Sequence, residues 1–240
     1  MAASARPDVW DPQQYERFRA EREQPFFDLL AMVTPRPALR VVDLGCGTGA
    51  LTAELHRRLG AAATLGVDSS AAMLAKCPAA EGLTFAQQRI EDFAAAAEHA
   101  GAFDLVLANA SLHWLPDHPA LFARLFALLA PGGQLAVQMP ANFAHPSHTI
   151  AERLARDAEF APALGVQRVV PVLSPERYAE LLFAQGAKRQ RVHLEVYAHV
   201  LTSRDDVVEW VRGTLLTWYQ ERLGEAAFAR FLARYRAELC

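Results

Sequence analysis

Hydrophobic and polar positions divide the chain into segments of two kinds. Short runs of β-branched residues predict strands, and longer stretches in which apolar residues recur every three or four positions predict helices. Strands are expected at 39–44, 63–68, 83–88, 103–108, 133–139 and 191–201. Helices are expected at 11–33, with one helix ending and another starting at Pro25, and at 50–59, 70–77, 119–130, 149–160, 175–185, 205–219 and 225–239.

The first five strands alternate with helical segments. This alternation predicts parallel strands joined by right-handed crossovers, with helices on both faces of the sheet. We therefore expect an α/β fold with a Rossmann-like, doubly wound and mostly parallel sheet. A single domain over 1–240 is expected, with an N-terminal helical lid at 11–33, a cofactor-binding core at 39–140, and helical insertions and C-terminal helices on the substrate side at 141–240.

Composition narrows the classes of partner. The 240 residues are 52% hydrophobic and 21% charged, as in a globular protein with its own core. A net charge of −3 without a basic block argues against nucleic acid as a partner. No apolar stretch approaches the ~20 residues of a membrane span and the N-terminus lacks an apolar leader, so we expect a cytoplasmic protein without membrane contact. The three scattered cysteines predict neither disulfides nor a metal site.

The stretch after the first strand carries the clearest chemical signal. Glycine occupies every second position, Gly45, Gly47 and Gly49, behind the acidic Asp43. Because glycine lacks a Cβ, a ligand can approach such a backbone closely. In the dinucleotide fingerprint GxGxxG the third glycine comes one residue later, and an acidic residue at the strand end disfavours a phosphate. The pattern favours a cationic ligand with an amino-acid tail, and S-adenosylmethionine is such a ligand.

The sequence DLGCGTG resembles the first motif of the class I S-adenosylmethionine-dependent methyltransferases, and later segments agree with this family in order and spacing. Asp68 ends the second strand, where the family has an acidic residue that binds both ribose hydroxyls, and PGG at 131–133 precedes the fifth strand. The resemblance implies methyl transfer from S-adenosylmethionine, which leaves S-adenosylhomocysteine. The cofactor-binding residues that it implies are Asp43, Gly45, Gly47, Gly49, Asp68, Ser69, Met73, Ile90 and Asn109.

Two features depart from the family pattern. Arg89 stands at the end of the third strand, where the family often has an aspartate for adenine, so the backbone around Ile90, with Glu91 or Asp92, is expected to replace it. The family's sheet ends in a seventh, antiparallel strand, and no strand-like run follows 191–201. We therefore expect either a chain shorter than its relatives or an open sheet edge, which makes the protein a monomer or a weak homodimer through that edge.

Three further segments, 10–25, 109–118 and 137–148, resemble the trans-aconitate 2-methyltransferases, bacterial enzymes that methylate a carboxylate of a small polyanionic acid. This resemblance covers the chain from residue 10 to about residue 235. It implies O-methylation of trans-aconitate or a related small anionic acid. The implied substrate-binding residues are Tyr15 and Arg22 on the lid and His113, Trp114, Gln138 and Asn142 after the fourth and fifth strands, with Tyr197, His145 and His148 as weaker candidates.

A carboxylate acceptor needs no catalytic base, because a group with a pKa near ~4 is already ionised at neutral pH. Alignment of the reacting atoms and exclusion of water then supply the catalysis. Arg22 is expected to neutralise the acceptor's other carboxylates, so that Arg22→Ala raises the acceptor KM far more than it weakens cofactor binding. A hydroxyl acceptor would need a base, and His113 is the candidate for it.

Alternatives of other kinds stay open at this point. The acceptor can instead be the carboxyl of a carrier-bound malonyl group or a hydroxyl of a small metabolite. A nicotinamide-dependent oxidoreductase on a similar sheet is a further alternative, although the early third glycine disfavours it. The chain can also be a module that binds S-adenosylmethionine without catalysis, because a fold does not fix a function.

Overall fold

A computed structural model describes residues 19–165, 169–213 and 215–240, and for 19–22 it describes only the backbone. The described residues form two compact units. We call the first the sheet unit, which comprises 22–140 and 171–194. The second, the helical unit, includes 141–165, 169–170, 195–213 and 215–240. The expected single domain with its three segments stays a prediction.

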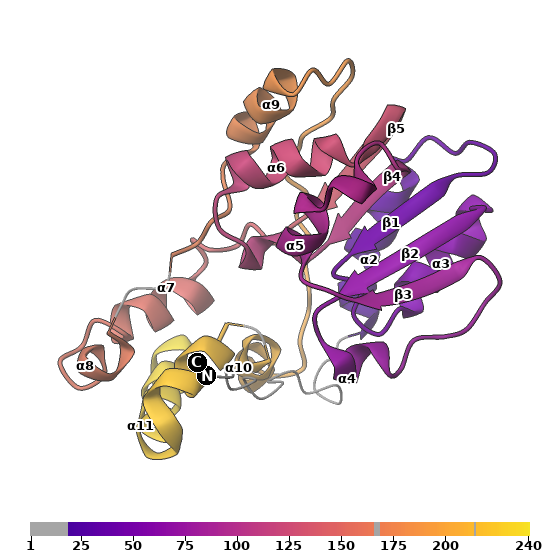
Figure 1. Cartoon of the computed structure of the whole chain (residues 1–240). Coiled ribbons are helices and arrows are strands. Elements are labelled where there is room, and N and C mark those ends of the chain that lie inside the picture. The colour runs from indigo at the N-terminus through magenta and orange to yellow at the C-terminus, as the bar shows by residue number, and fades with distance from the viewer. Residues whose placement is uncertain (1–18, 166–168, 214) are drawn as a thin grey trace, which may run out of the picture. The chain divides into compact units, whose positions relative to one another are not determined.

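The sheet unit contains five parallel strands in the order β3-β2-β1-β4-β5 (Figure 1). They are β1 (Arg40–Leu44), β2 (Ala63–Asp68), β3 (Leu83–Gln87), β4 (Phe103–Asn109) and β5 (Leu129–Gln138). The chain moves outward from β1 to β3 and then returns to the other side of β1 for β4. This confirms the prediction of a doubly wound parallel sheet, and it places a topological switch point between β1 and β4.

Helices cover both faces of the sheet. On one face α2 (Arg19–Ala31) and α3 (Ala50–Leu59) pack with Val41 and Leu105. On the other, α5 (Ile90–Ala95), α6 (His118–Ala127) and α9 (Pro175–Ala184) pack with Val42 and Val106 (Figure 1). Neighbouring residues of a strand thus point to opposite hydrophobic clusters, as the pleat requires. Shorter elements of this unit are α4 (Ala71–Leu74) and the 3-10 turns η1 (Ala97–His99) and η2 (Leu112–Trp114).

Some predicted boundaries are wrong. α2 continues through Pro25 instead of ending there. The helix expected at 119–130 ends at Ala127, because β5 begins at Leu129 and therefore contains the PGG tripeptide, next to an irregularity in its pairing with β4. The two-turn helix α5 was not predicted, and the helix expected at 70–77 shrinks to α4.

The expected sixth strand at 191–201 is also wrong. These residues belong to no strand in the structure, and Leu194, Val196 and Val200 are 62%, 80% and 100% exposed. The segment connects the two units, because the sheet unit ends at Leu194 and the helical unit resumes at Glu195. Alternating apolar positions make a strand only when a neighbouring strand supplies hydrogen-bond partners. β5 is therefore an edge of the sheet among the described residues.

The helical unit has a hydrophobic cluster of its own. It contains α7 (Pro146–Leu154), α8 (Ala161–Leu164), α10 (Arg204–Arg212) and α11 (Thr217–Leu239), whose apolar side chains pack together. The helices expected at 149–160 and 205–219 are thus shorter, and α11 begins earlier than expected and bends at Gly224, which has a φ of 70°. None of the described helices has the length and apolar character that a membrane crossing requires.

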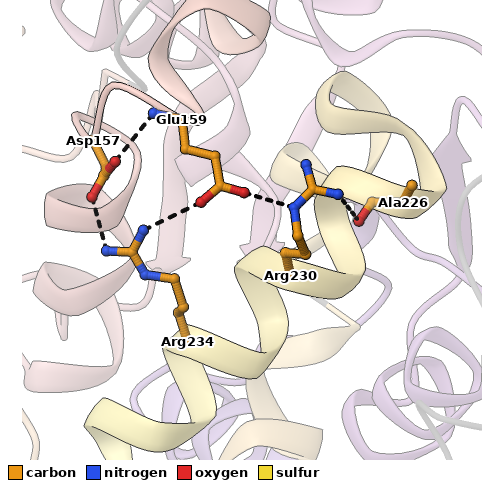
Figure 2. A network of polar contacts seen from close by, with 5 residues as sticks. All are labelled: Asp157, Glu159, Ala226, Arg230 and Arg234. Atoms are coloured by element: carbon orange, nitrogen blue, oxygen red, sulfur yellow. Dashed lines mark hydrogen bonds and ion pairs between the residues drawn. The ribbon is translucent and has the colours of Figure 1, made fainter.

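A network of ion pairs and hydrogen bonds joins α11 to the turn between α7 and α8 (Figure 2). Arg234 donates to Asp157 at 2.8 Å and to Glu159 at 3.5 Å, and Arg230 donates to Glu159 at 2.6 Å. Arg230 also donates to the carbonyl of Ala226 at 3.2 Å. Exposed ion pairs contribute little to the free energy of folding. We therefore interpret this network as orienting α11 relative to the turn, and not as a main source of stability.

Candidate active site

The candidate site lies at the carboxyl ends of the strands, at the switch point between β1 and β4. The backbone N–H groups of Gly45 and Cys46 donate to the carbonyl of Val67 at 2.7 and 3.1 Å, which fixes the loop after β1 beside β2. The hydroxyl of Ser111, in the loop after β4, donates to the carbonyl of Leu44 at 2.6 Å. The two loops that flank the switch point are therefore joined directly.

The three glycines of the loop have different surroundings. All have positive φ, between 55° and 81°. A Cβ at Gly45 would lie 2.3 Å from the Cβ of Ser111, and one at Gly49 would lie 2.6 Å from the ring of Phe85. At Gly47, no described atom lies within 4 Å of the position that a Cβ would take. Gly45 and Gly49 thus serve close packing within the protein, whereas Gly47 leaves room for a ligand.

The Asp68 carboxylate holds the glycine loop in place. One oxygen accepts the N–H of Gly47 at 2.8 Å, and the other accepts the N–H of Ser70 at 2.9 Å. Ser70 caps α4, because its hydroxyl accepts the N–H of Met73. A carboxylate oxygen has two lone pairs, so each oxygen can still accept one hydroxyl from a ligand. Asp68 can thus bind the N–H of Gly47 and the hydroxyls of a ribose at the same time.

Asp43 is buried beneath the glycine loop, with 4% of its surface exposed. It accepts the hydroxyl of Thr52 from α3 at 2.6 Å. Burial raises the pKa of Asp43 to about 6, in spite of the hydrogen bond from Thr52, which lowers it, and the neighbouring Asp68 charge raises it further. This carboxyl is poised to favour a positive charge placed near it.

The two cysteines near the loop are poor nucleophiles. Burial and the charges of nearby carboxylates raise the pKa of the Cys46 thiol, and burial also raises the pKa of the Cys77 thiol. Because the thiolate is the reactive form, neither cysteine is suited to chemistry at the site.

The side expected for adenine is apolar. Met73 and Ile90 are each 9% exposed, at α4 and at the start of α5. Arg89 points its charge at Glu91, with 2.5 Å between nitrogen and oxygen. Glu91 is therefore already paired with a cation, which leaves the backbone at Ile90 and the Asp92 side chain for a polar ligand group.

Two buried amide oxygens belong to neighbouring residues at the ends of β4 and β5. Asn109 and Gln138 stand opposite each other in the register of these strands. The Oδ1 of Asn109 and the Oε1 of Gln138 are buried, and neither has a hydrogen-bond partner among the described atoms. A buried acceptor without a donor costs about 1–3 kcal/mol, so this pair fits a ligand that brings hydrogen-bond donors.

His113 and Trp114 lie on η2, in the loop that follows β4. Their ring centroids are 4.6 Å apart, and Trp114 is 39% exposed. The residues that support this turn were not predicted from the sequence. His118 on α6 contacts the carbonyl of Leu112 through Nε2 at 3.1 Å and the hydroxyl of Tyr178 on α9 through Nδ1 at 2.5 Å. The spacing of 60 residues between His118 and Tyr178 gave no signal that they meet.

The remaining candidates lie elsewhere. Asn142 is exposed in the helical unit. In the same unit, His145 caps α7 by accepting the N–H of Ser147 at 3.3 Å, and Ser147 also contacts the buried His148 at 3.1 Å. Tyr197 belongs to the segment that resumes the helical unit. Tyr15 lies outside the described residues, and Arg22 lies in α2 where only the backbone is described.

A family model described as "Methyltransferase domain" matches residues 15–190. The trans-aconitate 2-methyltransferase of Deinococcus radiodurans is 45% identical to this chain, and the alignment covers 96% of the chain and 90% of that protein. The protein of the same name from Variovorax paradoxus is 42% identical over 94% of this chain and 87% of its own length.

Solved structures show the same fold. The YcgJ protein of Bacillus subtilis superposes with a TM-score of 0.58 at 15% identity, over 89% of this chain and 83% of its own. A phosphoethanolamine N-methyltransferase of Haemonchus contortus, in complex with S-adenosyl-L-methionine, gives a TM-score of 0.51 at 17% identity, over 99% of this chain and 57% of its own.

Proposed function

Because the chain belongs to the class I S-adenosylmethionine-dependent methyltransferases, we propose that it transfers a methyl group to one carboxylate of trans-aconitate and so produces a monomethyl ester. The cofactor of this family is S-adenosylmethionine. The observation that carries the proposed acceptor is the near-full-length similarity to the trans-aconitate 2-methyltransferases.

The residues at the switch point fit this cofactor. The open face of Gly47 offers bare backbone, and Asp68 beside it offers two carboxylate oxygens for ribose hydroxyls. The buried oxygens of Asn109 and Gln138 suit the ammonium group of the cofactor's amino-acid tail better than they suit a carboxylate. We therefore assign Gln138 to the cofactor instead of to the acceptor, and we keep the other expected cofactor residues.

When bound, the cofactor supplies a methyl group on a sulfonium. The chain's own residues would align the acceptor oxygen with that carbon and keep water out. Asp43 and the amide oxygens would hold the cationic end of the cofactor, and the exposed Trp114 would provide an apolar wall. His113 could donate a hydrogen bond to the acceptor, and an ionised carboxylate needs no proton transfer.

We further propose that Tyr15, Arg22, His113, Trp114 and Asn142 bind the acceptor. Arginine, tyrosine and asparagine are donors that suit a polycarboxylate. We also propose that the protein works in the cytoplasm as a monomer or a weak homodimer, with β5 as the sheet edge open to a second copy.

The proposal is tested by incubating the protein with S-adenosylmethionine and one acid at a time: trans-aconitate, citrate, isocitrate or a malonyl carrier. The expected product is a trans-aconitate monomethyl ester, detected by mass, with turnover at least tenfold above that of the other acids. Faster turnover of the malonyl carrier would mean that the malonyl carboxyl, and not trans-aconitate, is the acceptor. Cofactor binding without any turnover would point to a non-catalytic module.

A further inference from the structure

A series of buried hydrogen bonds runs through the sheet unit to the loop after β4. This loop carries His113 and Trp114, and we call it the acceptor loop. The N–H of Leu173 donates to the hydroxyl oxygen of Tyr178 at 3.1 Å, and that hydroxyl contacts Nδ1 of His118. The other ring nitrogen of His118, Nε2, contacts the carbonyl of Leu112 at 3.1 Å. His118 and Leu112 are 1% and 0% exposed, and Tyr178 is 8% exposed.

The partners fix where each proton lies. A carbonyl only accepts, so Nε2 of His118 carries a hydrogen and donates it to Leu112. In a neutral ring Nδ1 is then an acceptor, and it takes the hydroxyl hydrogen of Tyr178, whose oxygen accepts the N–H of Leu173. Burial lowers the pKa of His118 and raises the pKa of Tyr178, which keeps both side chains neutral. All members of this series are thus satisfied in one arrangement.

The series of hydrogen bonds ends at Leu112 in the acceptor loop. Leu112 is the first residue of η2, which carries His113 and Trp114. The residue before it, Ser111, fills the space beside Gly45 and donates to the carbonyl of Leu44. The loop is therefore held at two successive residues, by the glycine loop on one side and by α6 and α9 on the other.

We propose that His118 and Tyr178 are positioning residues for methyl transfer, which hold the carbonyl of Leu112 and thereby set His113 and Trp114 against the glycine loop. The inference rests on the proposed function in one respect, namely that this loop binds the acceptor. Neither side chain contacts the acceptor itself. A more mobile loop should therefore raise the KM for the acceptor and leave the affinity for the cofactor unchanged.

Tyr178→Phe removes only the hydroxyl and tests the inference. The amides of Trp114 and Leu115 donate to Ser111 and Leu112 at 3.3 and 2.9 Å. Their hydrogen exchange should become at least tenfold faster, while exchange in β1 and β2 stays as in the wild type. The KM for trans-aconitate should rise at least fivefold, and the Kd for S-adenosylhomocysteine should change less than twofold.

Tyr235→Phe is the matched control. Tyr235 is a buried tyrosine too, and its hydroxyl donates to the carbonyl of Ser147 at 2.8 Å within the helical unit. This variant should lower Tm and leave the exchange of Trp114 and Leu115 as in the wild type. Two variants of His118 provide a second test in case Tyr178→Phe does not fold. His118→Gln keeps a hydrogen-bond donor for the carbonyl of Leu112, whereas His118→Leu does not. Loop exchange in the glutamine variant should be closer to the wild type.

Two results would overturn the inference. One is unchanged exchange of the loop in Tyr178→Phe and in His118→Leu. The other is exchange that accelerates equally throughout the sheet unit, with cofactor affinity falling in parallel, because that pattern belongs to a residue with only a structural role. If the wild type methylates none of the acids, the proposed function fails, while the exchange and affinity measurements still decide the inference.

Discussion

Gly45 and Gly47 are two residues apart and meet different surroundings, which separates the packing role of the loop from its binding role. An alanine methyl at Gly47 would enter open space, whereas one at Gly45 would collide with Ser111. Both positions have positive φ, which costs an alanine about 1–2 kcal/mol.

We predict that Gly47→Ala stays folded, with Tm lower by only a few degrees, and binds S-adenosylhomocysteine at least tenfold more weakly. Gly45→Ala should lose much more stability because the backbone must shift. Calorimetric titration and thermal unfolding of both variants check this. Wild-type affinity in Gly47→Ala would show that the open face does not receive the cofactor.

Asp43 predicts a pH dependence of stability. Its pKa in the folded protein is about 6, which is above the ordinary value of an aspartate. The contribution of this group to stability is therefore fully present below pH about 4 and is lost as the pH rises through about 6. The difference in pKa corresponds to roughly 3 kcal/mol.

Asp43→Asn keeps an acceptor for Thr52 and removes the buried charge. We expect the variant to be more stable than the wild type at pH 8, by up to roughly 3 kcal/mol, and to lose this advantage near pH 4. Its affinity for S-adenosylmethionine should fall. Urea unfolding at the two pH values measures the effect, and a constant difference between the proteins would contradict the assignment.

At the residue scale, the sequence was informative where chemistry is local. The acidic ends of β1 and β2 and the glycine loop were predicted because each motif lies within a few residues. Which glycine faces the ligand was not predictable, because Ser111 and Phe85 come from distant parts of the chain. The contact between His118 and Tyr178 was missed for the same reason.

At the scale of elements, the break in α11 is a conformational requirement. Gly224 has φ 70° and ψ 168°, a region that only glycine populates readily. It lets the two parts of the helix place Tyr219 and Phe231 in one cluster. The sequence indicated a break before residue 225 but not its geometry.

Gly224→Ala should lower the free energy of unfolding by about 1–3 kcal/mol. Ala229→Gly, at an exposed position of the same helix, is a control for helix propensity and should cost about 1 kcal/mol. Urea unfolding curves compare the two. Equal stability of Gly224→Ala and the wild type would mean that the kink is not needed for packing.

Four strands of the sheet were predicted closely, because β2 has the expected bounds and β1, β3 and β4 differ from expectation by one residue. Among the helices, α3 has the expected bounds and α9 differs by one residue. Buried β-branched runs carry this signal within themselves. The segment 191–201 has the same pattern and is not a strand, because a strand also requires a partner that its own sequence does not specify.

For the whole molecule, we expect any self-association to involve the edge strand β5. Among the described residues no strand pairs with its far side. Sedimentation over a range of concentrations should show a monomer with a weak, concentration-dependent dimer. A stable monomer at the highest concentrations would contradict the open-edge proposal.

We propose that methyl transfer to an ionised carboxylate needs positioning and no base. The most direct measurement compares kcat of the wild type with that of His113→Gln from about pH 6 to 9, with trans-aconitate and S-adenosylmethionine saturating. We predict that the ratio of the two rates does not change with pH. A ratio of wild-type to variant rate that rises as the imidazole loses its proton, and levels off above the imidazole pKa, would instead make His113 a general base.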